Sequence, residues 1–272
     1  MSYYSVLGLE REPFSTSPDP EFFYHSASHH TALKRLEISI RLRRGLSLIL
    51  GDVGTGKTTL SRALLQAFAE ENDYIFHMIL DPGYKSEFQF LFSLVKMFNI
   101  IPDFKSTIDF KEALEKYLFQ KGVDENKTII LLIDEGQKIT TENLEVLRTL
   151  LNYETNEYKL LQLIIMAQVE LLPRIRRIRN FIDRVSLKYT INALDEAETS
   201  QMIEFRLKQA GYRHSAPLFT PGAIKAIYNY TQGYPRKIAM LCHDALEITV
   251  MKERYFVDEE IIDGLINQYA VL

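Results

Sequence analysis

A phosphate-loop pattern between an apolar run and a helical stretch constrains this chain more than any other feature. Residues 51–58 read Gly-Asp-Val-Gly-Thr-Gly-Lys-Thr and satisfy the pattern G-x-x-x-x-G-K-[ST]. The loop follows the apolar run 46–50 and precedes the helical stretch 60–69. In such a loop the glycines let backbone N–H groups converge on phosphate oxygens, and the helix N-terminus adds a favourable dipole. The sequence therefore predicts a P-loop that binds a nucleotide.

The chemistry of a bound triphosphate assigns roles within the loop. We expect Lys57 to reach the β- and γ-phosphates and the Thr58 hydroxyl to bind Mg2+. A glycine-rich turn without a ligand is the competing interpretation, and the Lys-Thr pair and the full match disfavour it. The predicted nucleotide-binding residues are Gly51, Asp52, Val53, Gly54, Thr55, Gly56, Lys57 and Thr58.

Short apolar runs alternate with helical stretches over the first two thirds of the chain. The runs at 46–50, 74–80, 129–133, 160–166 and 185–191 are the expected strands. The runs at 46–50, 129–133 and 160–166 are almost continuously apolar, which is typical of parallel strands that helices cover on both faces. The sequence predicts an α/β fold with a five-stranded, mainly parallel, doubly wound sheet.

The periodicity becomes purely helical after Asn192, which predicts a domain boundary. Helix-starting residues, such as Pro235, recur beyond that point. We expect an N-terminal arm and helix over 1–45 that pack on the core, a P-loop α/β domain over 46–192, and an α-helical domain over 193–272.

Composition limits the class of protein. The chain has 272 residues, 46% of them hydrophobic, and a formal net charge of -4, which suits a folded protein of one or two domains. The single cysteine, Cys242, leaves no intrachain disulfide and agrees with a reducing compartment, so we expect a cytoplasmic protein. The apolar runs fall well short of the roughly 18 residues of a membrane span.

The net negative charge of the chain argues against general binding of polyanions. Any nucleic-acid site would have to be local, at the arginine clusters 41–44 and 174–184.

Two acids, Asp134 and Glu135, end the third apolar run. Open α/β sheets bind ligands at the carboxyl ends of their strands, which is where these acids are expected. Asp134 would hold Mg2+ through water, and Glu135 would orient and deprotonate the water that attacks the γ-phosphate. Acids that merely cap the next helix are the alternative, and the P-loop upstream disfavours it. The predicted strand at 74–80, between the two motifs, fits NTPases with an additional strand and a catalytic glutamate.

Together these motifs resemble the ExeA/GspA family of AAA+ ATPases, which act in secretion and pilus assembly. The resemblance covers nearly the whole chain. It includes an N-terminal box within 7–24, a P-loop that extends to Thr59, and a Walker B segment at 132–137 that commonly reads D-E-A-Q in the family. The sequence G-Y-P-R at 233–236 matches the sensor 2 box. The resemblance implies ATP and Mg2+ as cofactors and a helical lid at the C-terminal end.

The resemblance also implies two sensor residues. Gln168 is similar in position to sensor 1, which contacts the γ-phosphate or the attacking water, although the alternative is a surface glutamine at a strand end. The family reads G-Q-P-E-L where this sequence has A-Q-V-E-L at 167–171. Arg236 is similar to sensor 2, which in AAA+ proteins closes the lid over the phosphates of the same subunit.

An arginine finger is the third implication of the resemblance. Arg184 precedes the last expected strand, where AAA+ proteins carry the arginine that reaches a neighbouring subunit's nucleotide. Such a finger requires assembly. The sequence leaves open which arginine of this stretch has the role, and the competitors are Arg174, Arg176, Arg177 and Arg179.

The resemblance implies an ATP hydrolase that forms a ring or filament with shared sites. It would act on a protein partner in secretion or pilus biogenesis, in the cytoplasm or at the inner membrane through that partner. Longer members add a membrane span and a peptidoglycan-binding domain, and because this sequence ends at Leu272 we expect no contact with the cell wall. The alternative is a DNA-binding regulator similar to the TniB and MuB transposition ATPases, with the arginine clusters lining a polymer. A scaffold without turnover is disfavoured by Glu135, Arg184 and Arg236.

Overall fold

The computed structural model describes residues 3–100 and 106–270 and divides into two compact units. The α/β unit comprises residues 29–53 and 60–191, and the helical unit comprises residues 1–28, 54–59 and 192–272. Each unit has its own hydrophobic core. Within the described ranges, no helix is both long and apolar enough to cross a membrane.

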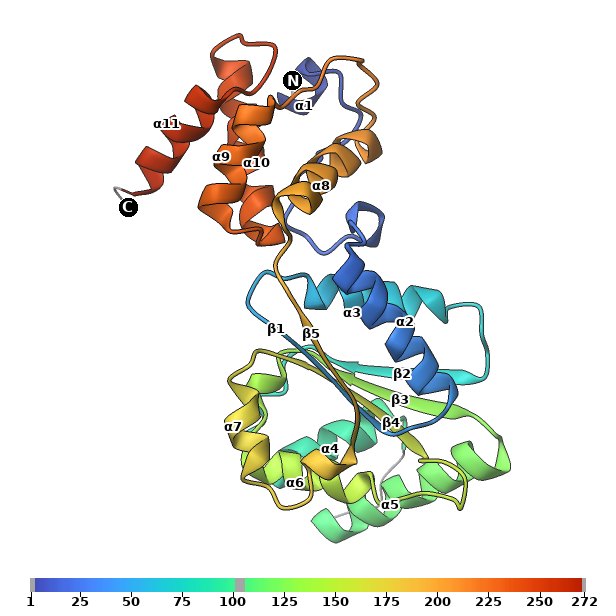
Figure 1. Ribbon diagram of the computed structural model, residues 1–272. Coiled ribbons are helices and arrows are strands. Elements are labelled where there is room, and N and C mark those ends of the chain that lie inside the picture. Colours follow the sequence, from blue (N-terminus) through green and yellow to red (C-terminus); the bar gives the residue numbers. More distant parts are fainter. Residues whose placement is uncertain (1–2, 101–105, 271–272) are drawn as a thin grey trace. The chain divides into compact units, whose positions relative to one another are not determined.

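The α/β unit is built on a five-stranded parallel sheet with the order β2-β3-β4-β1-β5. Helices cover both faces of this sheet, with α2 and α3 on one side and α4, α5 and α6 on the other (Figure 1). Every residue of β1, β3 and β4 is buried, which explains their continuously apolar sequences. The predicted fold class is confirmed. The strands are β1 (Leu46–Gly51), β2 (Tyr74–Ile79), β3 (Thr128–Ile133), β4 (Leu161–Ala167) and β5 (Val185–Ile191).

The helices of this unit begin at residues that suit helix starts. Ser86 caps α4, because its hydroxyl accepts a hydrogen bond from the N–H of Gln89 at 3.2 Å. Ser106 and Asp109 form a complete capping box at α5. The first turn of α3 begins at Lys57, directly after the P-loop glycines. The helices are α2 (Ala27–Arg41), α3 (Lys57–Ala67), α4 (Glu87–Met97), α5 (Thr107–Phe119), α6 (Thr141–Leu150) and α7 (Leu171–Arg176).

The helical unit packs four longer helices and a short N-terminal one around a second core (Figure 1). Cys242 lies fully buried in that core, and burial raises the pKa of its thiol, so it serves as a small packing residue rather than a nucleophile. The helices are α1 (Tyr3–Val6), α8 (Glu196–Gln209), α9 (Pro221–Thr231), α10 (Pro235–Met251) and α11 (Glu259–Tyr269).

The N-terminal arm supplies aromatic side chains to the helical unit. Leu9, Phe14 and Phe22 are buried in its core, and the Phe14 ring meets that of Phe219 edge to face at 5.9 Å. The sequence predicts that residues 1–45 pack on the α/β core, whereas in the structure residues up to Ser28 belong to the helical unit. The physical reason is that a small helical unit gains buried apolar area from these rings.

His77, one of several histidines with no evident role in the sequence, lies in β2 and makes stability depend on pH. Its ring stacks on Phe98 with centroids 4.2 Å apart, and burial lowers its pKa to about 4. As the pH falls below about 6.5, His77 therefore binds a proton in the unfolded chain but not in the folded chain. This contribution to stability is present above pH 6.5 and is lost as the pH falls toward 4.

We predict that His77→Phe weakens the loss of stability between pH 7 and pH 4.5. The measurement is urea unfolding at both pH values. His30→Phe, at an exposed position of α2, is the control for an added ring and should keep the wild-type pH dependence. A His77→Phe protein with an unchanged pH dependence would show that another group is responsible.

Candidate functional site

Three of the predicted motifs meet at the carboxyl ends of neighbouring strands. β4 pairs with β1 on one side and with β3 on the other, all in parallel. Gly51 ends β1, Asp134 follows β3, and Gln168 follows β4. The structure therefore brings these predicted positions to one edge of the sheet, where open α/β folds bind their ligands.

Two glycines of the P-loop adopt backbone conformations that other residues rarely adopt. Gly54 has φ +81° and Gly56 has φ +91°, values in the left-handed region that residues with a Cβ rarely adopt. Thr55 and Lys57 are buried, and Lys57 is the first residue of α3. A phosphate at this helix N-terminus would meet converging N–H groups and the positive end of the helix dipole.

Arg236 lies beside the P-loop segment that belongs to the helical unit. Its backbone N–H donates a hydrogen bond to the carbonyl of Gly54 at 3.2 Å, and its side chain is exposed. It stands in the first turn of α10, right after the helix-starting Pro235. The position predicted for sensor 2 thus adjoins the loop predicted to hold phosphates.

Close backbone packing explains the glycine that opens the G-Y-P-R box. Gly233 has φ +73°, and a Cβ placed on it would lie 1.8 Å from the carbonyl oxygen of Leu194. The N–H of Leu194 donates in turn to the carbonyl of Gly233 at 2.9 Å. This contact ties the chain just after β5 to the start of α10, which carries Arg236.

The two acids after β3 lie in different surroundings. Asp134 is only 2% exposed, and its Oδ1 accepts a hydrogen bond from the N–H of Glu135 at 2.9 Å. Glu135 is partly buried and has φ 51° and ψ 35°, a left-handed conformation that is uncommon without glycine. The chain therefore turns sharply at Glu135.

Gln137 joins the segment after β3 to the end of β4, a contact that the sequence pattern does not predict. Its Nε2 donates to Glu135 Oε2 at 2.6 Å, and its Oε1 accepts from the N–H of Gln168 at 3.1 Å. In the sequence, the only indication of this contact is the glutamine at the end of the D-E-G-Q segment, 134–137.

Gly136, where the family commonly has alanine, is packed against β4. A Cβ at this position would lie 2.4 Å from Ile165 Cγ2 and 3.2 Å from Ala167 Cβ. The turn Gly136–Lys138 can approach the strand this closely only without a side chain at its first residue. This packing holds the loop with Glu135 and Gln137 against β4.

The arginines of the stretch 174–184 have different partners. Arg174 is partly buried, and its Nη1 donates to the carbonyl of Gln137 at 2.8 Å and to the carbonyl of Ile139. Arg184 donates to the carbonyl of Asn180 at 2.8 Å and to Oδ1 of Asn152 at 2.5 Å. Both arginines therefore have partners within the chain, and those of Arg174 lie in the loop that follows β3. The exposed candidates are Arg176, Arg177 and Arg179.

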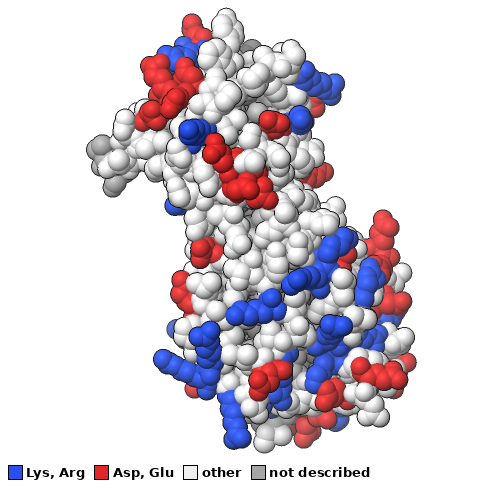
Figure 2. All heavy atoms as spheres, viewed as in Figure 1, with Lys and Arg blue, Asp and Glu red and all other residues white. Residues whose placement is uncertain are grey.

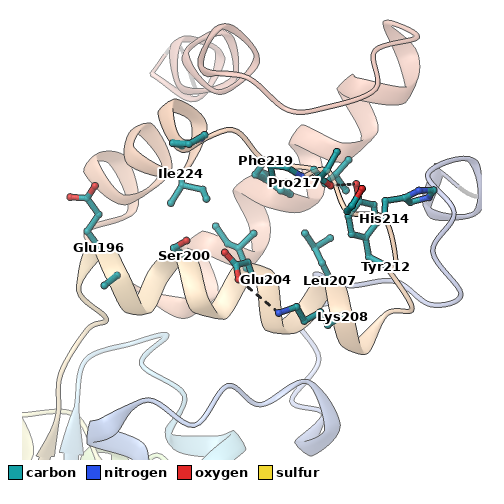
Figure 3. Close-up of a pocket in the computed structure, with 16 residues that line it drawn as sticks. Glu196, Ser200, Glu204, Leu207, Lys208, Tyr212, His214, Pro217, Phe219 and Ile224 are labelled. Atoms are coloured by element: carbon teal, nitrogen blue, oxygen red, sulfur yellow. Dashed lines mark hydrogen bonds and ion pairs between the residues drawn. The ribbon is translucent and has the colours of Figure 1, made fainter.

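A separate cavity of about 870 Å3 lies in the helical unit, between α8, the segment 212–219 and the start of α9 (Figure 3). Ile203, Leu207 and Phe219 form its apolar wall. An ion pair between Glu204 and Lys208, at 4.0 Å, lies along α8 at its rim. None of its lining residues belongs to the motifs predicted from the sequence.

Three side chains of types that bind metal ions lie together on α10. Ligand atoms of His243, Asp244 and Glu247 lie within 4.8 Å of one another. The His243 ring also contacts Glu12 Oε1 at 3.1 Å and the hydroxyl of Tyr3 at 2.9 Å. These contacts make it a polar link between the N-terminal arm and α10.

Comparisons with known proteins identify the family of the chain. A profile of an AAA domain matches residues 40–175. General secretion pathway protein A of Aeromonas hydrophila is 34% identical over 253 residues. The chain belongs to the GspA (ExeA) family of AAA ATPases. The match covers 90% of this chain and 44% of the relative, so the chain spans less than half the length of that GspA protein.

Solved structures share the fold at low sequence identity. The Aeropyrum pernix ORC2 protein superposes with a TM-score of 0.67 at 17% identity, over 95% of this chain and 71% of that chain. Drosophila ORC bound to DNA has a TM-score of 0.67 at 19% identity, over 97% and 65%. A Thermotoga maritima RuvB variant has a TM-score of 0.58 at 12% identity, over 88% and 68%. These likenesses establish the AAA fold of this GspA-family chain.

We predict that Gly136→Ala destabilises the α/β unit by about 1–3 kcal/mol, the usual cost of overpacking. The added methyl group would have to displace Ile165 or the turn itself. The free energy of unfolding in urea is the measurement. Gly264→Ala is the matched control, because a Cβ on Gly264 in α11 meets nothing within 4 Å. Equal stabilities of Gly136→Ala and wild type would mean that the loop does not pack this closely on β4.

Proposed function

We propose that this chain binds ATP with Mg2+ and hydrolyses it. The observation that carries the proposal is the arrangement of the P-loop, the acids after β3 and Gln168 at the ends of adjacent parallel strands. Membership of the GspA family of AAA ATPases supports it.

The oxygen donors in the site suit magnesium. Thr58 offers a hydroxyl and Asp134 a nearly buried carboxylate, and Mg2+ prefers oxygen ligands, phosphates and retained waters. When bound, Mg2+ would neutralise charge that develops on the phosphates. Thr58 would hold it directly and Asp134 through water.

The remaining residues act on the phosphates and on the attacking water. The Lys57 ammonium and the P-loop N–H groups bind the β- and γ-phosphates. The Glu135 carboxylate orients the water and accepts its proton during attack. Gln168, from the end of β4, contacts the γ-phosphate or that water, and Arg236 contacts the phosphates from α10.

We predict that substitutions in the P-loop and after β3 separate ATP binding from ATP hydrolysis. Lys57→Ala should abolish the heat of ATP binding in calorimetry with Mg2+, because it removes the cation that faces the phosphates. Glu135→Gln should keep that heat and lose about 10²- to 10⁴-fold in phosphate release, the usual contribution of a general base. Unchanged ATP binding by a folded Lys57→Ala protein would contradict the proposal.

The further proposal is an assembly in which neighbouring subunits complete each other's sites. Arg184, held by Asn152 and Asn180, is the proposed finger that stabilises the transition state in the next subunit. The assembly would be a ring or filament that acts on a protein partner in secretion or pilus biogenesis, in the cytoplasm or at the inner membrane. The name of the Aeromonas relative supports this partner class.

We predict complementation between two inactive variants if the sites are shared. Arg184→Ala should bind ATP normally and lose most of its turnover. Mixing it with Glu135→Gln should restore part of the activity, because some mixed sites pair an intact Glu135 with an intact Arg184. Arg179→Ala, at an exposed position nearby, tests a competing candidate for the finger and should stay active if Arg184 has the role. Full activity of a monomeric Arg184→Ala protein would rule out the shared site.

One observation favours a second function, the DNA-dependent regulation known for transposition ATPases. On the face shown in Figure 2, lysine and arginine side chains gather over the α/β unit. Basic surfaces bind nucleic acid through phosphate contacts that release counterions, so such binding weakens steeply with salt. Turnover that rises with double-stranded DNA at low salt, and loses this response at high salt, would favour the DNA-binding function over a protein partner.

A further inference from the structure

The side chain of Gln137 contacts both the proposed general base and the end of β4. A glutamine amide has one acceptor oxygen and a donor NH2 group. Because the N–H of Gln168 can only donate a hydrogen bond, its partner must be the Oε1 atom of Gln137. In this orientation of the amide, Gln137 Nε2 faces the Glu135 carboxylate. The network therefore determines which way the amide points.

The backbone that carries Gln137 is itself tied down. Within the turn, the N–H of Lys138 donates to the carbonyl of Glu135 at 2.8 Å, and Gly136 packs on β4. Arg174 donates to the carbonyl of Gln137 from α7. A side chain on such a support has little freedom, so its hydrogen bond can orient its partner.

We propose that Gln137 is a positioning residue that aims the Glu135 carboxylate for attack on the γ-phosphate. This inference rests on the proposed ATP hydrolysis. The donor bond to Glu135 Oε2, at 2.6 Å, has a charged acceptor and is of the stronger kind. It holds one carboxylate oxygen and leaves Oε1 to orient water. The acceptor bond links this base to Gln168, the residue proposed to contact the γ-phosphate.

The competing explanation is that Gln137 only anchors the loop through the Gln168 N–H. The two bonds of the amide can be separated by substitution. Gln137→Met removes both bonds at similar volume. Gln137→Glu keeps an oxygen that can accept from the Gln168 N–H, but places a carboxylate against that of Glu135, where like charges repel.

The experiment measures kcat and KM for ATP in wild type, Gln137→Met and Gln137→Glu, with folding checked by urea unfolding. We expect kcat to fall about 10- to 100-fold in both variants, because a misplacement of about 1 Å can cost about 100-fold. KM should stay within about twofold, since neither bond touches the P-loop residues proposed to bind ATP. The matched control is Gln162→Met, whose kcat should remain near wild type. Gln162 lies on β4, and its buried amide accepts a hydrogen bond from the N–H of Gly45 and donates one to the carbonyl of Lys159.

A double-variant cycle tests whether Gln137 acts through Glu135. Once Glu135→Gln has removed the base, adding Gln137→Met should lower kcat little further, because the two act as one unit. Additive losses would contradict the positioning role. A Gln137→Glu protein with near-wild-type kcat, beside an impaired Gln137→Met protein, would establish the loop anchor instead. If wild type itself released no phosphate, the proposed hydrolysis would fail, and this inference with it.

Discussion

Parallel hydrogen bonding of β4 to β1 on one side and to β3 on the other brings the functional segments together. Parallel strands end at the same edge, so the P-loop after β1, the acids after β3 and Gln168 after β4 become neighbours. This pairing persists because helices cover both faces and every residue of the three strands is buried. Each fully buried leucine or isoleucine contributes roughly 1.5–3 kcal/mol, so the central strands resist any shift in register.

Close backbone approaches refine the site that the sheet creates. Gly54 allows the left-handed turn of the P-loop, Gly136 lets the Walker B turn lie on β4, and Gly233 lets the chain at Leu194 contact the start of α10. At each of these positions a side chain would meet another residue, and at Gly54 the nearest atom is the Cβ of Arg236, at 3.0 Å. The left-handed backbone of Glu135 belongs to the same set, because sparsely populated conformations persist where the surrounding contacts hold them.

The two units obtain their cores in different ways. The α/β unit buries a sheet between helices, whereas the helical unit adds Leu9, Phe14 and Phe22 from the distant N-terminal arm. Periodicity predicted the helices of this unit, but it held no information on which of the two cores the arm would join. The number of aromatic residues in the arm indicated that it packs, and only the folded chain showed where.

Local patterns in the sequence determined the fold class, the strands and the P-loop, because apolar runs and glycine spacing act within a few residues of the chain. The family assignment rested on the same motifs and was confirmed, while the roles of Gln168, Arg184 and Arg236 stay predictions. The tertiary structure alone decided that Gln137 bridges Glu135 and the Gln168 N–H, and that Arg174 supports the loop. The contacts of Gln137 with Gln168 and Arg174 join residues 31 and 37 positions apart, so they depend on how β3, β4 and α7 pack. No local sequence rule specifies that packing, because it results from the burial of many side chains at once.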